Sequence, residues 1–350
     1  MIEKIIEKYK NKKKQFFLDF PEKHKNQYAF AGVGSHSISN LYPVLSYLSV
    51  PLKMIYSRSL VNAEKMAKRF SGAVGVNDID SICKSPNING VFICVKSEIH
   101  FELVKKCLEA GKHVFVDKPP CTSLKELEEL IELEKEKKAI CVVGLQRRYS
   151  KIYGLLSGKI SKAISYNYNF YTGAYPEGNI IYDLFIHPID ILIYLFGAIT
   201  EVKSNVVKNQ KGLNISLLTK HDSGCCGTVD LSSMYSWQKI EENLRIVTPK
   251  SVFRAEYPVF LSETNLQGQI FGMPMEKVMP SKYSRQNIYY DNNYLNPVKE
   301  YNTLTYQGFF DEINTFVNLI ENGKGENKSS LKQLNPVYDL IEKIEQNISR

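Results

Sequence analysis

The chain has 350 residues, of which 43% are hydrophobic and 23% charged, a balance typical of a globular protein. This length is sufficient for two domains. The formal net charge is +8, and eight lysines against four acids in the first 25 residues supply half of it. Because the remainder is only mildly basic and has no repeated basic and aromatic platform, the composition argues against nucleic-acid binding.

Cysteine usage argues against a metal-binding protein, and hydropathy argues against a membrane-spanning one. The seven cysteines form no C-x-x-C pair and no metal-ligand spacing, so we expect reduced core residues and no bound metal. The vicinal pair Cys225–Cys226 leaves a redox role open, although a strand holding two small residues explains it as well. The most apolar later stretch, 180–199, contains Asp183, His187 and Asp190, so no membrane span is expected. No signal peptide is apparent, and we expect a cytoplasmic protein.

Residues 1–26 are predicted to form a helical arm. Ile2, Ile5, Ile6 and Tyr9 fall on one helical face, and the lysine-rich stretch 10–14 is solvated. We expect a surface helix packed on its own domain. An arm that reaches a neighbouring subunit is the alternative.

Residues 27–148 are predicted to form a dinucleotide-binding domain. A short apolar strand at Tyr28–Ala31 runs into Gly32-Val-Gly34-Ser-His-Ser37, and a second apolar run follows at Leu52–Tyr56. Gly32 permits a tight turn and Gly34 lets backbone approach a pyrophosphate, although Ser37 replaces the third glycine of the usual fingerprint. Pro43 restricts the start of the intervening helix, which we place near Asn40.

Further apolar strands at 90–95, 113–116 and 140–143 alternate with helices. Such alternation predicts an α/β fold with a Rossmann-type, doubly wound parallel sheet. Ligands of these sheets bind beyond the carboxyl ends of the strands. The segments at those ends are 32–37, 57–58, 96–100, 117–120 and 146–148.

Residues 149–350 are predicted to form an α+β domain for substrate binding and oligomerisation, with a large, open, mostly antiparallel sheet. Strands are expected near 164–170, 201–208, 213–219, 227–234, 243–248 and 252–256, with a hairpin turn at 222–224. Helices are expected at 309–320 and 335–348, the second of which could pack back on the first domain. The stretch 265–300 gives no assignment.

A helix over 179–196 places Asp183, His187 and Asp190 at i, i+4 and i+7 on one face of a buried element. Ionisable groups in such a place need partners or a function. An internal hydrogen-bonded network is one interpretation, and it fits Asp190 well. The functional hypothesis is that His187 exchanges a proton with a substrate hydroxyl, while Asp183 orients the imidazole or the substrate.

From Tyr28 onwards the chain resembles the Gfo/Idh/MocA family (glucose–fructose oxidoreductase, inositol dehydrogenase and rhizopine catabolism). The likeness is strongest across 88–119, where Asp117-Lys118-Pro119 stands for the family's Glu-Lys-Pro. The segment 146–149 matches the basic segment of the family, and 183–190 matches its catalytic helix. Three features depart from the family: Val95-Lys96 replaces Thr-Pro, Asp117 replaces Glu, and only Gly178 precedes the catalytic helix.

The resemblance implies an NAD(P)-dependent oxidoreductase that acts on a secondary alcohol or ketone of a sugar, sugar nucleotide or cyclitol. It implies Lys118, Asp183 and His187 as catalytic residues, with His187 the acid/base and Lys118 beside the nicotinamide. It also implies a homo-dimer or homo-tetramer assembled through the open sheet. A regulator without turnover is an alternative, and so is a cofactor-retaining transhydrogenase or glycosidase.

Ser57-Arg58 ends the second strand, where an acid would bind the ribose diol of NAD. Arginine suits a 2′-phosphate, so NADP is favoured and NAD stays possible; Arg58 stacking on adenine is the alternative. The expected cofactor-binding residues are Gly32, Gly34, Ser35, His36, Ser57, Arg58, Cys94, Lys96, His100, Asp117, Lys118, Gln146 and Arg147. The expected substrate-binding residues are Lys118, Arg148, Tyr171, Asn179, Asp183 and His187. Tyr166, Tyr168 and Tyr175 could extend the substrate wall, although a tyrosine-rich sheet face explains them equally well.

Overall fold

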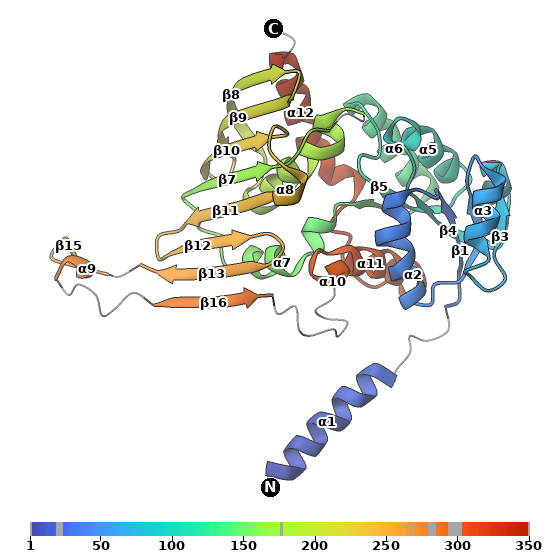
Figure 1. Ribbon diagram of the computed structural model, residues 1–350, viewed down its shortest axis with the longest axis horizontal. Coiled ribbons are helices and arrows are strands. Elements are labelled where there is room, and N and C mark those ends of the chain that lie inside the picture. Colours follow the sequence, from blue (N-terminus) through green and yellow to red (C-terminus); the bar gives the residue numbers. More distant parts are fainter. Residues whose placement is uncertain are drawn as a thin grey trace.

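The computed structural model describes residues 2–18, 24–175, 178–266, 268–278, 285–292 and 303–348. Two large sheets dominate the molecule, and helices fill the space between them (Figure 1). The first sheet is formed by the N-terminal part of the chain. The second is formed by the part that follows residue 164.

The first sheet has six strands in the order β3-β2-β1-β4-β5-β6, and every adjacent pair is parallel. The strands are β1 (Gln27–Ala31), β2 (Leu52–Tyr56), β3 (Val74–Val76), β4 (Ile88–Ile93), β5 (His113–Asp117) and β6 (Cys141–Gly144). This order confirms the doubly wound fold. From β1 the chain adds β2 and β3 on one side, and it then returns to add β4, β5 and β6 on the other side of β1. Such sheets form a ligand crevice at this point, between β1 and β4.

The helices of this part are α2 (Tyr42–Tyr47), α3 (Leu60–Ala67), α4 (Ile79–Cys83), α5 (His100–Glu109) and α6 (Leu124–Lys137). The predicted helix start near Asn40 is wrong. A π-helical turn, η1 (Ser37–Leu41), comes first, and α2 begins at Tyr42 with Pro43 in its first turn. The chain is already helical from residue 35, and the π turn ahead of α2 is the irregular place in the helix at which a residue without an N–H is accommodated.

The second sheet has eight strands in the order β16-β13-β12-β11-β7-β10-β9-β8, visible from bottom to top on the left of Figure 1. They are β7 (Ser165–Tyr171), β8 (Ile199–Asn209), β9 (Gly212–His221), β10 (Cys226–Ser232), β11 (Glu241–Val247), β12 (Ser251–Glu256), β13 (Phe260–Asn265) and β16 (Gln286–Asp291). Only the β7–β10 pair of this sheet is parallel. The mostly antiparallel sheet is therefore confirmed. Part of the unassigned stretch 265–300 forms β16, the small β14 (Gln269–Ile270) and β15 (Met273–Pro274), and α9 (Met275–Val278).

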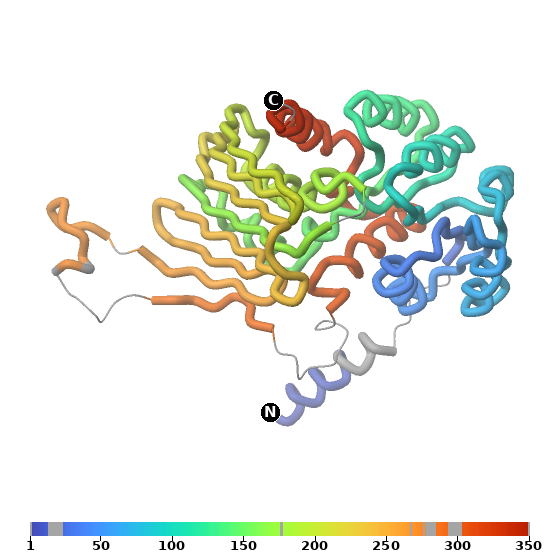
Figure 2. Tube along the Cα trace, turned by 45° about the horizontal axis from the view of Figure 1, so that its top comes forward, coloured from blue at the N-terminus to red at the C-terminus, as the bar shows by residue number. Residues whose placement is uncertain are grey.

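Helices α7 (Lys151–Ser157), α8 (Ile186–Phe196) and α12 (Asn335–Ile348) lie on the side of this sheet that faces the first sheet (Figures 1 and 2). Tyr166, Tyr168 and Phe170 of β7 point to that side and are buried. Tyr171 points to the other side, where its hydroxyl donates to Asp230 Oδ2 at 2.8 Å. The prediction that Tyr171 binds substrate is therefore wrong, because strand alternation turns it away from the side of the sheet on which α8 packs.

Helix α11 (Phe309–Asn322) returns to the first sheet, where the Phe316 ring lies 5.1 Å from Phe92 and 5.9 Å from Phe115. Helix α12 instead packs on α6, α8 and β8. The C-terminal segment thus joins both halves of the molecule.

The arm α1 (Ile2–Leu18) projects away from the body in Figure 1. Its apolar side chains Ile2, Ile5, Ile6 and Tyr9 are 47–73% exposed. The expectation that this helix packs on its own domain is therefore wrong for these side chains.

Candidate functional site

A pocket of about 830 Å³ lies at the carboxyl ends of the strands of the first sheet. Its walls come from the glycine loop 32–37, from 56–58 after β2, from 94–99 after β4, and from Asp117 and Lys118 at the end of β5. Tyr175, Gly178 and Asp183 of the second half complete it. Four of the five strand-end segments expected from the sequence therefore meet here. No residue of 146–148 is among the described residues that line the pocket.

The glycine loop is shaped by a close backbone approach. Gly32 has φ +125°, and a Cβ there would lie 1.9 Å from the Cys94 carbonyl oxygen, so no other residue fits. Ser37 replaces the third glycine and is buried. Its hydroxyl donates to Gly34 O at 2.9 Å and accepts the Gly34 N–H at 3.0 Å, which closes the loop on itself.

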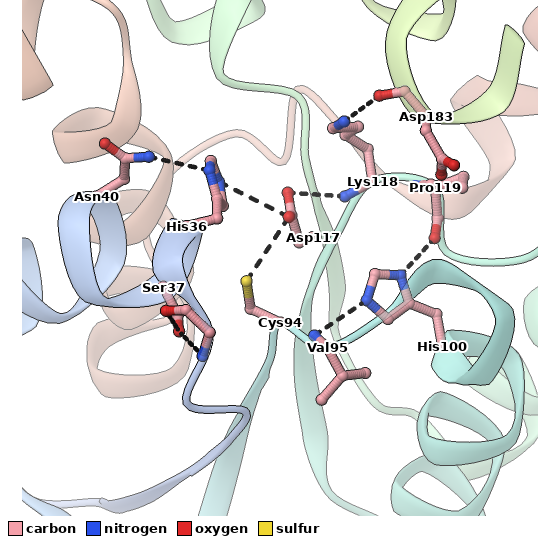
Figure 3. A network of polar contacts seen from close by, with 11 residues as sticks. His36, Ser37, Asn40, Cys94, Val95, His100, Asp117, Lys118, Pro119 and Asp183 are labelled. Atoms are coloured by element: carbon pink, nitrogen blue, oxygen red, sulfur yellow. Dashed lines mark hydrogen bonds and ion pairs between the residues drawn. The ribbon is translucent and has the colours of Figure 1, made fainter. Parts of the chain in front are cut away.

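Asp117 connects three of the pocket segments (Figure 3). Its Oδ1 accepts the Lys118 N–H at 2.9 Å, and its Oδ2 accepts from the Cys94 thiol at 3.7 Å. The same Oδ2 lies 3.7 Å from His36 Nε2, and the other ring nitrogen of His36 is 2.9 Å from Asn40 Nδ2. The shorter carboxylate at this position therefore ties β4, the glycine loop and the Lys118 turn together.

His100 joins two backbone segments behind the pocket by hydrogen bonds. Its Nε2 accepts the Val95 N–H at 3.3 Å, which leaves the proton on Nδ1, and Nδ1 donates to Pro119 O at 2.6 Å. Burial lowers the pKa of His100 and keeps this tautomer neutral. The expectation that His100 contacts the cofactor is not retained, since both ring nitrogens are used within the protein.

Lys118 reaches from the first half of the molecule to the helix of Asp183 and His187, where its ammonium donates to the main-chain oxygen of Asp183 (Figure 3). That helix opens with a π turn, η4 (Ile181–Phe185), before α8. Pro188 has no N–H to donate, so the regular hydrogen-bond ladder is interrupted close to this carbonyl. Burial lowers the pKa of Lys118 below its usual 10.5.

Asp183 faces the pocket because Gly178 makes room for it. Gly178 has φ +67°, and a Cβ there would lie 2.1 Å from Asp183 Oδ2. Burial raises the pKa of Asp183, while a hydrogen bond from Ser97 and the charge of Lys118 oppose this shift.

His187 lies one helical turn after Asp183 and is only 8% exposed. Its Nδ1 is buried, with no hydrogen-bond partner in the part of the chain that the structure describes. Burial lowers the pKa of His187 well below its usual 6.5, and the positive charges of Arg147, Lys118 and His36 add to this. These effects favour the neutral form of the imidazole. Lys118 and Asp183 are among the described residues that line the pocket, and His187 is not.

Arg147 and Arg148 belong to buried ion pairs, which corrects their expected roles in cofactor and substrate binding. Arg147 Nε and Nη2 donate to Glu242 at 2.9 and 2.6 Å, and Arg148 Nε donates to Asp190 Oδ2 at 2.9 Å. Arg148 Nη1 also donates to the Lys328 carbonyl at 2.6 Å. Both guanidinium groups are held inside the protein. Asp190 takes part in an internal hydrogen-bonded ion pair, which is the structural interpretation offered for it above.

Asn179 lines an adjoining pocket of about 960 Å³, which shares Glu98, Tyr175 and Gly178 with the first. Its Nδ2 donates to Glu345 Oε1 at 2.8 Å. Tyr56, Ser97 and Glu98 were missed by the sequence analysis, although each adjoins a strand end that it had identified. Gly178 was noted only as a remnant of the family pattern.

Comparison with known proteins identifies the family. A model described as the oxidoreductase family, NAD-binding Rossmann fold, matches residues 27–145, and a GFO/IDH/MocA C-terminal domain model matches residues 159–254. The chain belongs to the Gfo/Idh/MocA oxidoreductase family. The sequence resemblance and the expected family fold are therefore confirmed.

Among curated Gfo/Idh/MocA relatives, scyllo-inositol 2-dehydrogenase (NAD(+)) of Bacillus subtilis (strain 168) is 33% identical over 49% of this chain and 56% of that protein. The NADP(+) enzyme IolW of the same organism is 28% identical over 42% of this chain and 46% of that protein. The chain spans about half the length of these relatives. A solved dehydrogenase from Chromobacterium violaceum shares the fold with a TM-score of 0.80 at 17% identity, covering 92% of this chain and 95% of that one.

The pocket fits the dinucleotide that this Rossmann fold binds. At Gly32 the turn presents backbone with no side chain to the pocket. At Gly34 the space beside the backbone is open, because a Cβ there would meet nothing within 4 Å. Ser57 and Arg58 lie at the end of β2, and Lys118 lies at the end of β5.

Among the described helices, none is both long and apolar enough to cross a membrane.

Proposed function

We propose that the protein is an NAD(P)-dependent dehydrogenase or reductase for a secondary alcohol or ketone of a sugar, sugar nucleotide or cyclitol. The observation that carries the proposal is the contact between Lys118 and the Asp183 carbonyl. This contact joins the nucleotide pocket to the helix of Asp183 and His187. The relatives named as inositol dehydrogenases support a polyhydroxylated ring as substrate.

The bound nicotinamide would supply hydride transfer, and the protein supplies placement and proton transfer. In the oxidation direction, the neutral imidazole of His187 accepts the substrate hydroxyl proton. The Lys118 ammonium stabilises the negative charge that develops on the oxygen. The Asp183 carboxylate orients the substrate. The substrate ring would lie in the first pocket beside Lys118 and Asp183, one helical turn from His187.

The direct test is nicotinamide absorbance with purified protein, NADPH or NADH, and a panel of sugars, sugar nucleotides and inositols with their ketones. Turnover with at least one member is expected. Bound cofactor with no turnover for any member would contradict the proposal. Ligand-dependent partner binding in that case would favour the regulator.

Cofactor preference provides a second prediction. Arg58 is exposed at the pocket rim, where a guanidinium can pair with a 2′-phosphate. Arg58→Ala should weaken NADPH binding by roughly 10- to 100-fold, the value of a charge-assisted hydrogen bond, and leave NADH affinity nearly unchanged. Fluorescence titration of both cofactors measures this, with Arg69→Ala as the matched surface control. Equal losses for both cofactors would show that Arg58 binds the adenine instead.

The pH dependence of oxidation has a defined sign. His187 must be neutral to accept a proton, and burial lowers its pKa, so the acid limb of kcat/KM should lie below pH 6.5. Lys118 must be protonated, and its lowered pKa places the alkaline limb below pH 10.5. Steady-state rates across this range test both limbs. An acid limb above pH 6.5 would contradict the assignment of His187 as the base.

A further inference from the structure

Two thiols approach each other about two helical turns along α5 from His100. Cys83 Sγ and Cys107 Sγ are 4.0 Å apart, although they lie 24 residues apart in the chain. Cys83 ends α4, Cys107 lies in the last turn of α5, and the two helices pack together. Two oxidisable groups on separate elements are therefore in contact.

The two thiols differ in exposure. Cys83 is half-buried and Cys107 is fully buried. A hydrogen bond from the Cys107 thiol lowers the pKa of Cys83, and Lys106 and Lys112 lower it further, while burial and Asp80 oppose the shift. Cys83 is therefore the thiol that solvent reaches and the better nucleophile. Cys107 lies where its sulfur can attack an oxidised Cys83 sulfur and form a disulfide.

Charged groups around the pair hold this geometry. Lys106 Nζ lies 3.6 Å from Asp80 Oδ1 and so links α5 to α4. Lys112 Nζ donates to Ser85 O at 2.6 Å and to Ile88 O at 2.9 Å, which fixes the chain that leaves Cys83. Both lysines lie close enough to the Cys83 sulfur for their charges to lower its pKa, which favours the reactive thiolate.

We propose that Cys83 and Cys107 form a reversible disulfide on reaction with hydrogen peroxide or another hydroperoxide. The Cys83 thiolate attacks a peroxide oxygen, so that an S–O bond forms and the O–O bond breaks, releasing water or an alcohol. The Cys107 sulfur then attacks the Cys83 sulfur. An S–S bond forms, the S–O bond breaks, and the hydroxide leaves as water with the Cys107 proton. The two thiols lose two electrons and two protons in total, and the peroxide is reduced.

The disulfide would connect the redox state to the nucleotide pocket through α5. That helix begins at His100, which bonds to the Val95 N–H in one pocket segment and to the Pro119 carbonyl next to Lys118 in another. The pair itself lies outside the pocket and takes no part in the proposed hydride or proton transfer. Its oxidation can therefore be tested whether or not the dehydrogenase activity is found.

The experiment treats the reduced full-length protein with stoichiometric hydrogen peroxide and maps the cysteines by mass spectrometry. The expected product is one cross-linked peptide pair, Cys83 with Cys107, lighter by two hydrogens and restored by dithiothreitol. Cys107→Ser should stop the reaction at a sulfenic acid on Cys83 that dimedone labels. Cys226→Ser, which removes an exposed thiol elsewhere, should leave the cross-link unchanged.

Two results would overturn the proposal. One is wild-type protein in which Cys83 and Cys107 stay reduced while Cys226 oxidises. The other is oxidation of Cys83 to a sulfinic acid with no cross-link in the presence of Cys107.

Discussion

His187→Ala is expected to lower kcat by about 10²- to 10⁴-fold, the usual contribution of a positioned acid or base. Cofactor affinity should stay unchanged, because His187 lies on the catalytic helix, outside the described residues that line the nucleotide pocket. The removed group is a buried imidazole whose Nδ1 has no partner in the described part of the chain, so its loss breaks no internal hydrogen bond there. Stopped-flow reduction and cofactor titration separate the two effects.

The matched control is His113→Gln. His113 is a half-buried histidine at the start of β5, at the opposite end of the strand from the pocket, and it accepts the Ile140 N–H at 3.0 Å. Turnover in this variant should match that of the unaltered protein. Unchanged turnover in His187→Ala would refute the acid/base assignment, and equal losses in the two variants would indicate a folding defect.

Asp190→Ala is expected to destabilise the protein by about 3–5 kcal/mol, the typical cost of removing one partner from a buried ion pair. Among the described residues, the buried Arg148 guanidinium would keep the Lys328 carbonyl and the Gln333 amide oxygen as its hydrogen-bond acceptors. Chemical denaturation monitored by circular dichroism measures the change in the free energy of unfolding.

Glu201→Ala provides the comparison, since Glu201 pairs with Lys220 at 2.6 Å on the exposed face of the second sheet. Its denaturation midpoint should not move. A stable Asp190→Ala variant with weakened substrate binding would contradict the structural role of the Arg148–Asp190 pair. It would return Arg148 to the substrate site.

The first half of the fold could be predicted because its signals are local. Apolar runs that end in Gly32, Ser57, Lys96 and Asp117 mark buried parallel strands, and their carboxyl ends must share one edge of the sheet. The strand-end walls of the pocket follow from that rule, whereas Tyr175, Gly178 and Asp183 come from the second half. Asp183 and His187 could be paired because four residues separate them on one helix.

The remaining features depend on partners that are distant in the chain. Arg147 and Arg148 look like anion-binding residues until Glu242 and Asp190 are brought against them by the second sheet and α8. Tyr171 looks like a substrate contact until the register of β7 assigns its face. The short β3 was missed because three residues, one of them glycine, carry too little pattern.

The central claim is that Lys118 and His187 act on the same substrate oxygen beside the nicotinamide. A crystal structure with NADPH and a bound inositol or sugar measures this directly. Both nitrogens are predicted to lie within about 2.6–3.2 Å of one ring hydroxyl oxygen, with its carbon facing the nicotinamide. A bound substrate whose reacting oxygen contacts neither nitrogen would contradict the account.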